Sequence, residues 1–437
     1  MIRAARGYSN LSPEAIAKVK IALLDFLSCA YESLDLPPSR QAIEVAGRAG
    51  GGPASVIGTK VRASAAEAAF ANAVLGHGLV REDMHTGSVS HLGIVIFPTL
   101  LALAQSRKVT GRDFIAGTIC GYEIGASVGC ALMDLETVRI FRPTGITGPL
   151  GAAVAGSRML GLTEDAGVSA LGLAANATGG LNEWPAAGAD DMFFHAGFAA
   201  RNAVTAVELA ELGAFGSETA LDGPAGLFAA LRHRDRVSHV APFQGDNLEI
   251  FSVYHKPAPA CNYAQTACQA ALAISLENAA DSLDITAIQV KCTAAAINYP
   301  GCNATGPFER VLQAKMSIHF CVAATLARQS IEESNYRLLN DPEIARLIGV
   351  TKLQEDAELT QAYPGRQGSE VIVTLRNGKV LRKRMSDLIP ATPDQIRARF
   401  RSAAGDAAKT IEQAVDNLDQ LEDVGSISSA RARPREQ

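Results

Sequence analysis

The chain has 437 residues, of which 48% are hydrophobic and 19% charged, so it is long enough for about two or three domains and can bury a large core. Its formal net charge of −5, with no basic block, excludes the electrostatic surface that nucleic-acid-binding proteins carry. Only 5% of the residues are aromatic, which favours closely packed helices over an aromatic-rich β-sandwich.

The cysteines and the apolar segments predict where the protein acts. The eight cysteines form no CxxC pair and show neither zinc-ribbon nor iron–sulfur spacing. In a chain of this size, that pattern predicts reduced thiols and a cytoplasmic protein. The first residues lack the apolar core of a signal peptide, and no uninterrupted apolar run reaches the roughly 18 residues of a membrane span. We therefore expect neither a membrane nor a nucleic acid as a partner.

Helix start signals and apolar spacing mark the first part of the chain. The Ser-Pro-Glu sequence at 12–14 is typical of a helix start, with a capping side chain followed by proline and an acid. Ser and Glu at the ends of 64–67 form a capping-box pattern before an alanine-rich helix that reaches His77. Further buried helices are expected over 94–105 and 111–132.

The segment His77–Pro98 is polar and lies between two apolar helices. It contains three of the eight histidines (His77, His85 and His91) and the acidic pair Glu82 and Asp83. Because histidine titrates near neutrality, histidines beside carboxylates suit proton transfer at cellular pH. The alternative is a solvated loop in which the histidines cluster by chance.

Two more polar segments precede helices. Arg142 lies at a junction broken by Pro143, where its guanidinium could face a cavity or remain solvated in a surface ion pair. The proline-rich loop 255–263 holds Lys256 and Cys261 just before a helix expected over 264–277. A lysine beside partly buried backbone can act as a base, although an exposed lysine is the commoner outcome.

The sequence pattern changes from about residue 281. Residues 283–293 alternate like a strand, and residues 369–385 predict a hairpin with Asn377-Gly378 in its turn. We therefore expect a mainly α fold with a large all-helical domain and a smaller, lid-like α+β domain. The expected ranges are 1–265 for the first part of the helical domain, 266–390 for the smaller domain, 391–423 for a helical return to the first domain, and 424–437 for a disordered tail.

Five segments, in this order, resemble the MmgE/PrpD family over nearly the whole chain. They are His77 through His91-Leu92-Gly93 and Pro98, Arg142-Pro143-Thr144, His195-Ala196-Gly197, Lys256-Pro257-Ala258-Pro259, and Ala314-Lys315-Met316-Ser317. That family contains 2-methylcitrate dehydratases, cis-aconitate decarboxylases and an iminodisuccinate epimerase. The resemblance implies a homodimer that acts on small di- or tricarboxylates without a metal or an organic cofactor.

The resemblance places the family's catalytic histidine on His91 and its lysine on Lys256, and Asp83 and His85 keep the family pattern. The chain departs from the family at several polar positions. Val80, Met84, Met192 and Phe320 stand where Asp, Thr, Lys and Tyr are common, Arg142 stands for a histidine, and Cys261 or Gln265 stands for another. This is not a standard dehydratase or decarboxylase pocket.

An epimerase needs less than these lyases do, namely two acid/base groups on opposite faces of one carbon and clamps for the carboxylates. We expect His91 and Lys256 as the two groups, with Cys261 as a third candidate base. The expected substrate-binding residues are Arg142 as a bidentate carboxylate clamp, with Thr144, Asp83, His85 and His77. The leading hypothesis is an isomerase most like the iminodisuccinate epimerase. The alternatives are a hydro-lyase on a 2-methylcitrate- or citrate-like acid and a catalytically inactive scaffold.

One further alternative is a zinc site formed by Asp83, His85 and His91. Carboxylate and imidazole groups do ligate zinc, but a loop without helical HExxH spacing is a weak pattern for it. We expect no metal site and no cofactor.

Overall fold

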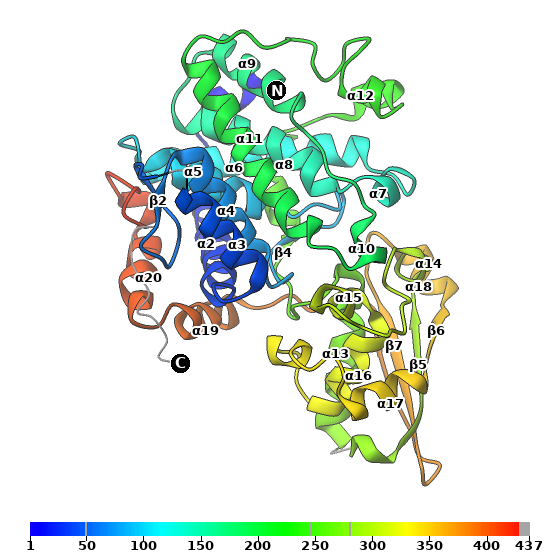
Figure 1. Cartoon of the computed structure of the whole chain (residues 1–437). Coiled ribbons are helices and arrows are strands. Elements are labelled where there is room, and N and C mark those ends of the chain that lie inside the picture. Colours follow the sequence, from blue (N-terminus) through cyan, green and yellow to red (C-terminus); the bar gives the residue numbers. More distant parts are fainter. Residues whose placement is uncertain (49, 245–246, 279–280, 428–437) are drawn as a thin grey trace.

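The computed structural model describes residues 1–48, 50–244, 247–278 and 281–427. The fold is mainly α-helical with a smaller α+β region, as the sequence predicts (Figure 1). The helices of the first region are α1 (Ile2–Gly7), α2 (Pro13–Glu32), α3 (Pro37–Arg48), α4 (Ala65–His77), α5 (Gly93–Ala104), α6 (Gly111–Leu132), α7 (Thr137–Ile140), α8 (Pro143–Met159), α9 (Glu164–Ala175), α10 (Trp184–Ala187), α11 (Asp191–Glu211) and α12 (Leu227–Ala230).

The predicted helix starts are confirmed by their caps. The Ser12 side chain accepts a hydrogen bond from the Ala15 N–H at the start of α2, and Ser64 accepts one from the Glu67 N–H at the start of α4. These bonds satisfy N–H groups that have no partner within the helix. The predicted buried helix over 94–105 is α5, whose residues are all buried.

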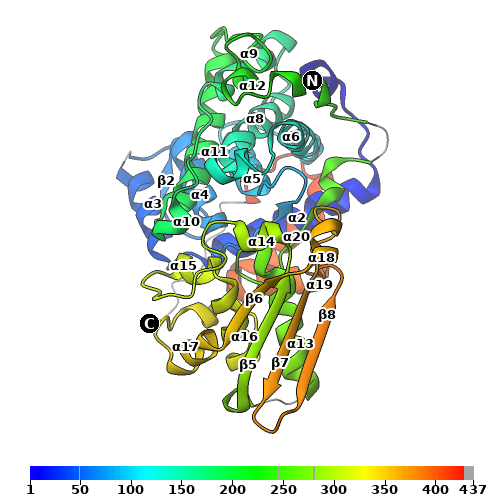
Figure 2. The same ribbon diagram turned by 90° about the vertical axis from the view of Figure 1, so that its right-hand side faces the viewer.

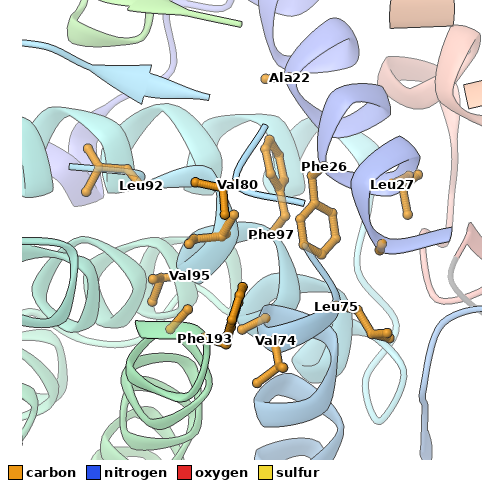
Figure 3. Packing of buried hydrophobic residues seen from close by; sticks show 14 of the residues in the cluster. Ala22, Phe26, Leu27, Val74, Leu75, Val80, Leu92, Val95, Phe97 and Phe193 are labelled. Carbon is orange, nitrogen blue, oxygen red and sulfur yellow. The ribbon is translucent and has the colours of Figure 1, made fainter. Parts of the chain in front are cut away.

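Helices α4, α5, α8 and α11 pack against one another and form the centre of the helical core. Figure 3 shows Phe26 of α2 beside Phe97 of α5, with ring centroids 5.8 Å apart. Small residues let α6 and α8 approach closely, because a Cβ added to Gly151 would lie 2.5 Å from the Gly121 carbonyl oxygen. Helix α6 is long and apolar enough to span a membrane by length and composition, but 94% of its most apolar window is buried within the fold.

The smaller region is built on a four-stranded sheet with the order β6-β5-β7-β8. Strands β5 and β6 are parallel, and the other neighbours are antiparallel. Helices α13 and α16 pack on the sheet (Figure 2). The predicted strand and hairpin are confirmed, and Gly378 in the hairpin turn has the positive φ of 83° that glycine tolerates. The bounds are β5 (Ile285–Cys292), β6 (Thr351–Glu355), β7 (Ser369–Leu375), β8 (Val380–Met385), α13 (Gln265–Asn278), α14 (Ala294–Asn298), α15 (Val311–Met316), α16 (Ile318–Arg328), α17 (Pro342–Gly349) and α18 (Ala357–Ala362).

After the sheet, the chain runs back along the helical region. Helix α19 (Pro393–Ala404) packs against α2, and α20 (Ala408–Asp416) follows it (Figure 1). Arg399 of α19 donates hydrogen bonds to the carbonyl oxygens of Lys256 at 3.1 Å and Pro257 at 2.5 Å. Helix α19 therefore holds the backbone of the loop that contains Lys256.

The expected disorder from residue 424 onward is wrong for residues 424–427. Val424 and Ile427 are buried, and the Val424 N–H donates to the Val109 carbonyl oxygen at 3.0 Å. The apolar residues of this mostly polar tail pack against the helical region, which composition alone does not predict. Residues 428–437 of the predicted tail lie outside the described residues.

Candidate active site

Residues from distant parts of the chain meet beside the end of α4. That helix ends at His77, and a loop then leads to α5. Within this loop, β3 (Met84–His85) pairs with β4 (Val253–Tyr254), which brings it beside the loop that contains Lys256. The alternative of a solvated loop is wrong, because residues 77–85 are all buried.

Glu82 is at the centre of this arrangement. Three nitrogen atoms surround its Oε1, namely His77 Nδ1 at 2.9 Å, His91 Nδ1 at 3.4 Å and Lys256 Nζ at 3.5 Å. Burial alone would raise the pKa of this carboxyl, but the charge of Lys256, together with the N–H of His77, holds the pKa of Glu82 well below its usual range. Glu82 is therefore a buried anion at neutral pH, and Lys256 provides the counter-charge.

The protonation of His77 follows from its neighbours. A guanidinium can only donate, so Arg142 Nη2, 3.2 Å away, donates to His77 Nε2. The ring proton of neutral His77 must then be on Nδ1, which faces Glu82 at 2.9 Å. Burial lowers the pKa of His77, so the neutral form is the stable one. His77 thus links the carboxylate of Glu82 to the guanidinium of Arg142.

His91 is also held in one tautomer. Its Nδ1 lies 2.7 Å from the Asp83 carbonyl oxygen, which can only accept, so Nδ1 carries the proton. No described residue donates to Nε2. Burial and the charges of Lys256 and Arg142 lower the pKa of His91 well below its usual value. His91 is therefore a neutral imidazole whose Nε2 is free to accept a proton.

Lys256 is fully buried, and its hydrogen-bonding capacity is used within the protein. Its Nζ donates to the carbonyl oxygens of Val80 at 2.6 Å and Ala260 at 3.4 Å, and the third neighbour is Glu82. The backbone of Val80, which provides one of these carbonyl groups, has a φ of 60°, a rare conformation for a β-branched residue. Lys256 is therefore a fixed positive charge here, and the predicted role as a base requires its release from these acceptors.

Arg142 precedes α8 and is only 5% exposed. Its Cζ lies 5.6 Å from the centroid of the Trp184 ring. A Cβ added to Gly180, whose φ is 121°, would lie 3.1 Å from Arg142 Cβ and 3.3 Å from His195 Cγ, so glycine permits this close approach. Burial and the charge of Arg142 lower the pKa of His195 to about 4. His195 is thus neutral beside a buried guanidinium.

Several polar atoms around Arg142 lack partners. Arg142 Nε, Trp184 Nε1 and His195 Nδ1 are buried without a hydrogen bond, and among the described residues no carboxylate forms an ion pair with Arg142. Burying a cation and polar N–H groups without partners costs free energy. This cluster is therefore suited to an anionic ligand.

Cys261 lies at the end of the same loop as Lys256. Its backbone N–H donates to the Lys315 carbonyl oxygen at 2.8 Å, and its Sγ lies 3.6 Å from Cys302 Sγ. The hydrogen bond from Cys302 and the nearby charges of Lys256 and Arg142 lower the pKa of the Cys261 thiol, although burial opposes them. Cys261 is therefore the most acidic candidate thiol near the site.

The structure does not bring all the predicted residues together. His85 contacts the Ser88 hydroxyl and Glu249, each at 2.9 Å, and lies outside the Glu82 cluster. The Asp83 carboxylate accepts from the Tyr122 hydroxyl at 2.5 Å, so it is the carbonyl of Asp83 that contacts His91. Thr144 reaches His91 only through the His91 backbone N–H, at 3.1 Å.

The zinc alternative is wrong for the same reason. The side chains of Asp83 and His85 are directed to different partners, and the described part of the chain holds no group of three His, Cys, Asp or Glu side chains with metal-ligand geometry. These residues are close in sequence, but their side chains point in different directions.

The sequence patterns assign no role to Glu82, His195 or Trp184. The role of Glu82 depends on Lys256, which is distant in sequence. The approach of His195 to Arg142 depends on Gly180. A signal for these residues would have been a long-range contact, which a single sequence does not display.

The side chains of the site are buried, and a hollow of about 510 Å³ lies nearby. The hollow is between α10 and the small region and is lined by Pro185, Tyr299 and Gln313, among others. The Tyr299 hydroxyl accepts a hydrogen bond from Asn182 at 3.1 Å. Burial raises the pKa of Tyr299, and the charge of Arg142 opposes this rise. Tyr299 therefore lies between the hollow and the surroundings of Arg142.

Comparison with known proteins identifies two matching family models. The MmgE/PrpD N-terminal domain matches residues 4–239, and the MmgE/PrpD C-terminal domain matches residues 258–420. The cis-aconitate decarboxylase-like protein oryM of Aspergillus oryzae is 30% identical over 51% of this chain and 48% of its own length, so this match spans about half of each protein. The cis-aconitate decarboxylase of Aspergillus terreus is 22% identical over 96% of this chain and 92% of its own length. That of Homo sapiens is 25% identical over 84% and 79%.

Proposed function

The chain belongs to the MmgE/PrpD family, and on this premise we propose that it is an isomerase that moves a proton at the carbon next to a carboxylate of a small polycarboxylate. The substrate we propose is iminodisuccinate, which the enzyme would epimerise without a metal or an organic cofactor. Family membership supports the acid/base enzyme, and the choice of epimerisation rests on the residues of this chain.

The observation that carries the proposal is the buried guanidinium of Arg142 without an anionic partner among the described residues. A substrate carboxylate would supply the missing negative charge, and the planar fork of arginine matches its two oxygens. The unpartnered Trp184 Nε1 could donate to the same group. A small acid bound here would place its α-carbon near the neutral His91.

His91 is the proposed base for one face of the substrate. Its free Nε2 would take the proton from the α-carbon, and the electron pair would move into the carboxylate to give an enediolate. The charges of Lys256 and Arg142 would stabilise the negative charge that develops. Glu82, 3.4 Å from Nδ1, would stabilise the imidazolium formed on His91.

Cys261 is the proposed group on the opposite face. Epimerisation requires a proton to return from the side opposite to the base, and the Cys261 thiol is a donor that becomes a stable thiolate readily. Lys256, expected from the sequence for this role, has its hydrogens on Val80, Ala260 and Glu82. We therefore assign Lys256 to charge stabilisation.

A lyase is the second candidate. The relatives named cis-aconitate decarboxylase favour it, since they are similar to this chain over most of its length. The apolar residues Val80, Met84, Met192 and Phe320 favour the epimerase, because these buried side chains cannot assist a leaving group. Loss of water would produce a new alkene and decarboxylation would release carbon dioxide, whereas epimerisation would do neither.

Proton NMR in D₂O tests the proposal with single-enantiomer dicarboxylates, iminodisuccinate made in situ, malate, cis-aconitate and citrate-type acids. We expect deuterium at the α-carbon of iminodisuccinate, loss of optical activity and no alkene signal. New alkene protons from a saturated acid, or conversion of cis-aconitate with release of carbon dioxide, would show the lyase instead. Absence of exchange with every acid would show an inactive family member that serves as a scaffold.

We also propose a homodimer in the cytoplasm. The family resemblance supports the dimer, and the eight free cysteines are compatible with a reducing compartment. Light scattering on the purified protein at several concentrations would measure the assembly, and a mass of one chain at all of them would contradict it.

A further inference from the structure

The thiols of Cys261 and Cys302 form a close pair beside the proposed site. Their Sγ atoms are 3.6 Å apart and both residues are buried. A disulfide bond is about 2.05 Å long, so the two sulfur atoms would have to approach by only about 1.5 Å. Small rotations of the two side chains can supply this movement.

The backbones of both cysteines are tied to the same short segment. The Cys261 N–H donates to the Lys315 carbonyl oxygen at 2.8 Å, and the Ile318 N–H donates to the Cys302 carbonyl oxygen at 2.9 Å. The segment from α15 to α16 thus holds the two loops in register. The preceding Gly301, with a φ of 82°, places Cys302 at the end of a turn. The proximity of the thiols is therefore built into the loops.

The two thiols differ chemically. The hydrogen bond from Cys302 and the charges of Lys256 and Arg142 lower the pKa of the Cys261 thiol, so this thiol gives up its proton more readily, whereas burial raises the pKa of Cys302 well above its usual value. Cys302 therefore keeps its proton and can donate it toward Cys261. A thiolate beside a neutral thiol is the arrangement in which an oxidised sulfur is attacked by its neighbour.

We propose that Cys261 and Cys302 are a redox modification site, at which a hydroperoxide converts the two thiols into a reversible disulfide. The Cys261 thiolate attacks the peroxide oxygen, which breaks the O–O bond and gives a sulfenic acid and an alkoxide or hydroxide ion. The Cys302 sulfur then attacks the Cys261 sulfur, which forms the S–S bond and releases the sulfenic oxygen as water with the Cys302 proton. The peroxide is reduced by two electrons, and the two thiols are oxidised.

The modification would act on the chemistry of the site. A disulfide removes the thiol of Cys261 and with it the proposed proton donor. A reductant of the dithiol class restores both thiols. The inference itself stands on the thiol pair and does not depend on the identity of the substrate, because its test measures mass and not turnover.

The test uses the full chain with the substitution Cys130→Ser, which removes the exposed cysteine. The protein is treated with hydrogen peroxide, denatured, alkylated and analysed by mass spectrometry. We expect two fewer alkylated thiols, one cross-linked peptide that joins residues 261 and 302, and full recovery after reduction. The loss should be at least about tenfold faster than any loss at Cys268 and Cys321, because Lys256 and Arg142 favour the thiolate at Cys261.

Two variants decide between this pair and other thiols. Cys302→Ser should abolish the cross-link, with a melting temperature close to that of the parent. Cys268→Ser removes a buried thiol of a neighbouring pair and should leave the cross-link unchanged. The proposal is overturned if every thiol still alkylates after peroxide treatment, or if Cys302→Ser still loses two thiols because Cys261 forms a disulfide with another cysteine.

Discussion

Two carboxylates in this protein are each surrounded by three cationic or titratable groups, yet their surroundings differ. Glu82 contacts His77, His91 and Lys256, whose side chains are at most 7% exposed. In the sheet, Glu370 contacts Lys291, Arg382 and Arg384, whose side chains are 27%, 61% and 34% exposed. The two carboxylates have the same number of partners, but the partners of Glu370 are much more exposed to water than those of Glu82.

The difference explains why we assign the proposed chemistry to the cluster around Glu82 and not to the cluster around Glu370. Water screens the charges around Glu370, so those pairs contribute little beyond local order. Around Glu82, a missing charge would leave its partners buried without compensation. The same burial keeps His91 neutral, and it leaves the cations Lys256 and Arg142 in surroundings that favour an anionic substrate. Substitutions that separate screening from burial test this contrast.

The largest effect is expected for Glu82→Gln. The substitution keeps the shape but leaves the Lys256 ammonium buried without its counter-charge, so the free energy of unfolding should fall by about 3–5 kcal/mol. Chemical denaturation at pH 7 measures it.

Glu370→Gln is the matched control. It removes the same charge from partners that water reaches, and the cost should stay below about 1 kcal/mol. Equal losses in the two variants would contradict the role we assign to burial.

His91→Asn should abolish the proposed base while keeping a group that can donate to the Asp83 carbonyl. We expect the rate of α-proton exchange to fall by about 10²–10⁴, with little change in stability. His233→Asn serves as the control, because His233 contacts Thr137 and Asp134 and has no contact with the Glu82 cluster among the interactions of the described residues. A rate within about twofold of the parent would exclude His91 as the base.

Arg142→Lys should weaken binding more than turnover, because an ammonium cannot form the paired hydrogen bonds of the guanidinium. We expect KM for the dicarboxylate to rise about tenfold to a hundredfold, as the loss of one charge-assisted bond implies. Arg384→Lys makes the same change in the sheet and should leave KM unaltered. If KM were unchanged in Arg142→Lys, the carboxylate clamp would lie elsewhere.

The smallest effect concerns Asp83. Burial raises the pKa of its carboxyl group to about 6, and the hydrogen bond from Tyr122 opposes this rise. A carboxyl group whose folded-state pKa exceeds its ordinary value of 3.8 stabilises the fold at low pH and loses this contribution as pH rises through about 6. The parent should therefore lose about 1 kcal/mol relative to Asp83→Asn between pH 5 and pH 7.5. Parallel pH dependences of the two proteins would show that Asp83 does not titrate in this range.

Much of the fold follows from local patterns. The Ser12 and Ser64 caps, the apolar spacing of α5 and the turn at Gly378 each depend on a few neighbouring residues. The packing of Val424 could not be predicted in this way, because its partner Val109 is distant in sequence. Local sequence patterns therefore predict the helices, strands and turns, but not the contacts between them.

The site shows the same limit. The sequence and the family resemblance brought His91, Lys256 and Arg142 together as a set, and the structure places them around Glu82 and His77. Orientation was beyond the sequence, since His85 is directed to Glu249 and the Lys256 ammonium to Val80. Which way a side chain points depends on acceptors supplied by other segments.

The two bonds from Arg399 to the carbonyl oxygens of Lys256 and Pro257 have a consequence for biosynthesis. A ribosome makes the chain from its N-terminus, so every residue of the site is already present long before Arg399 emerges. The loop with Lys256 nevertheless lacks two of its donors until that moment. The nascent chain would thus carry a complete set of reactive groups in an unfinished arrangement, and activity would begin only with its last helices.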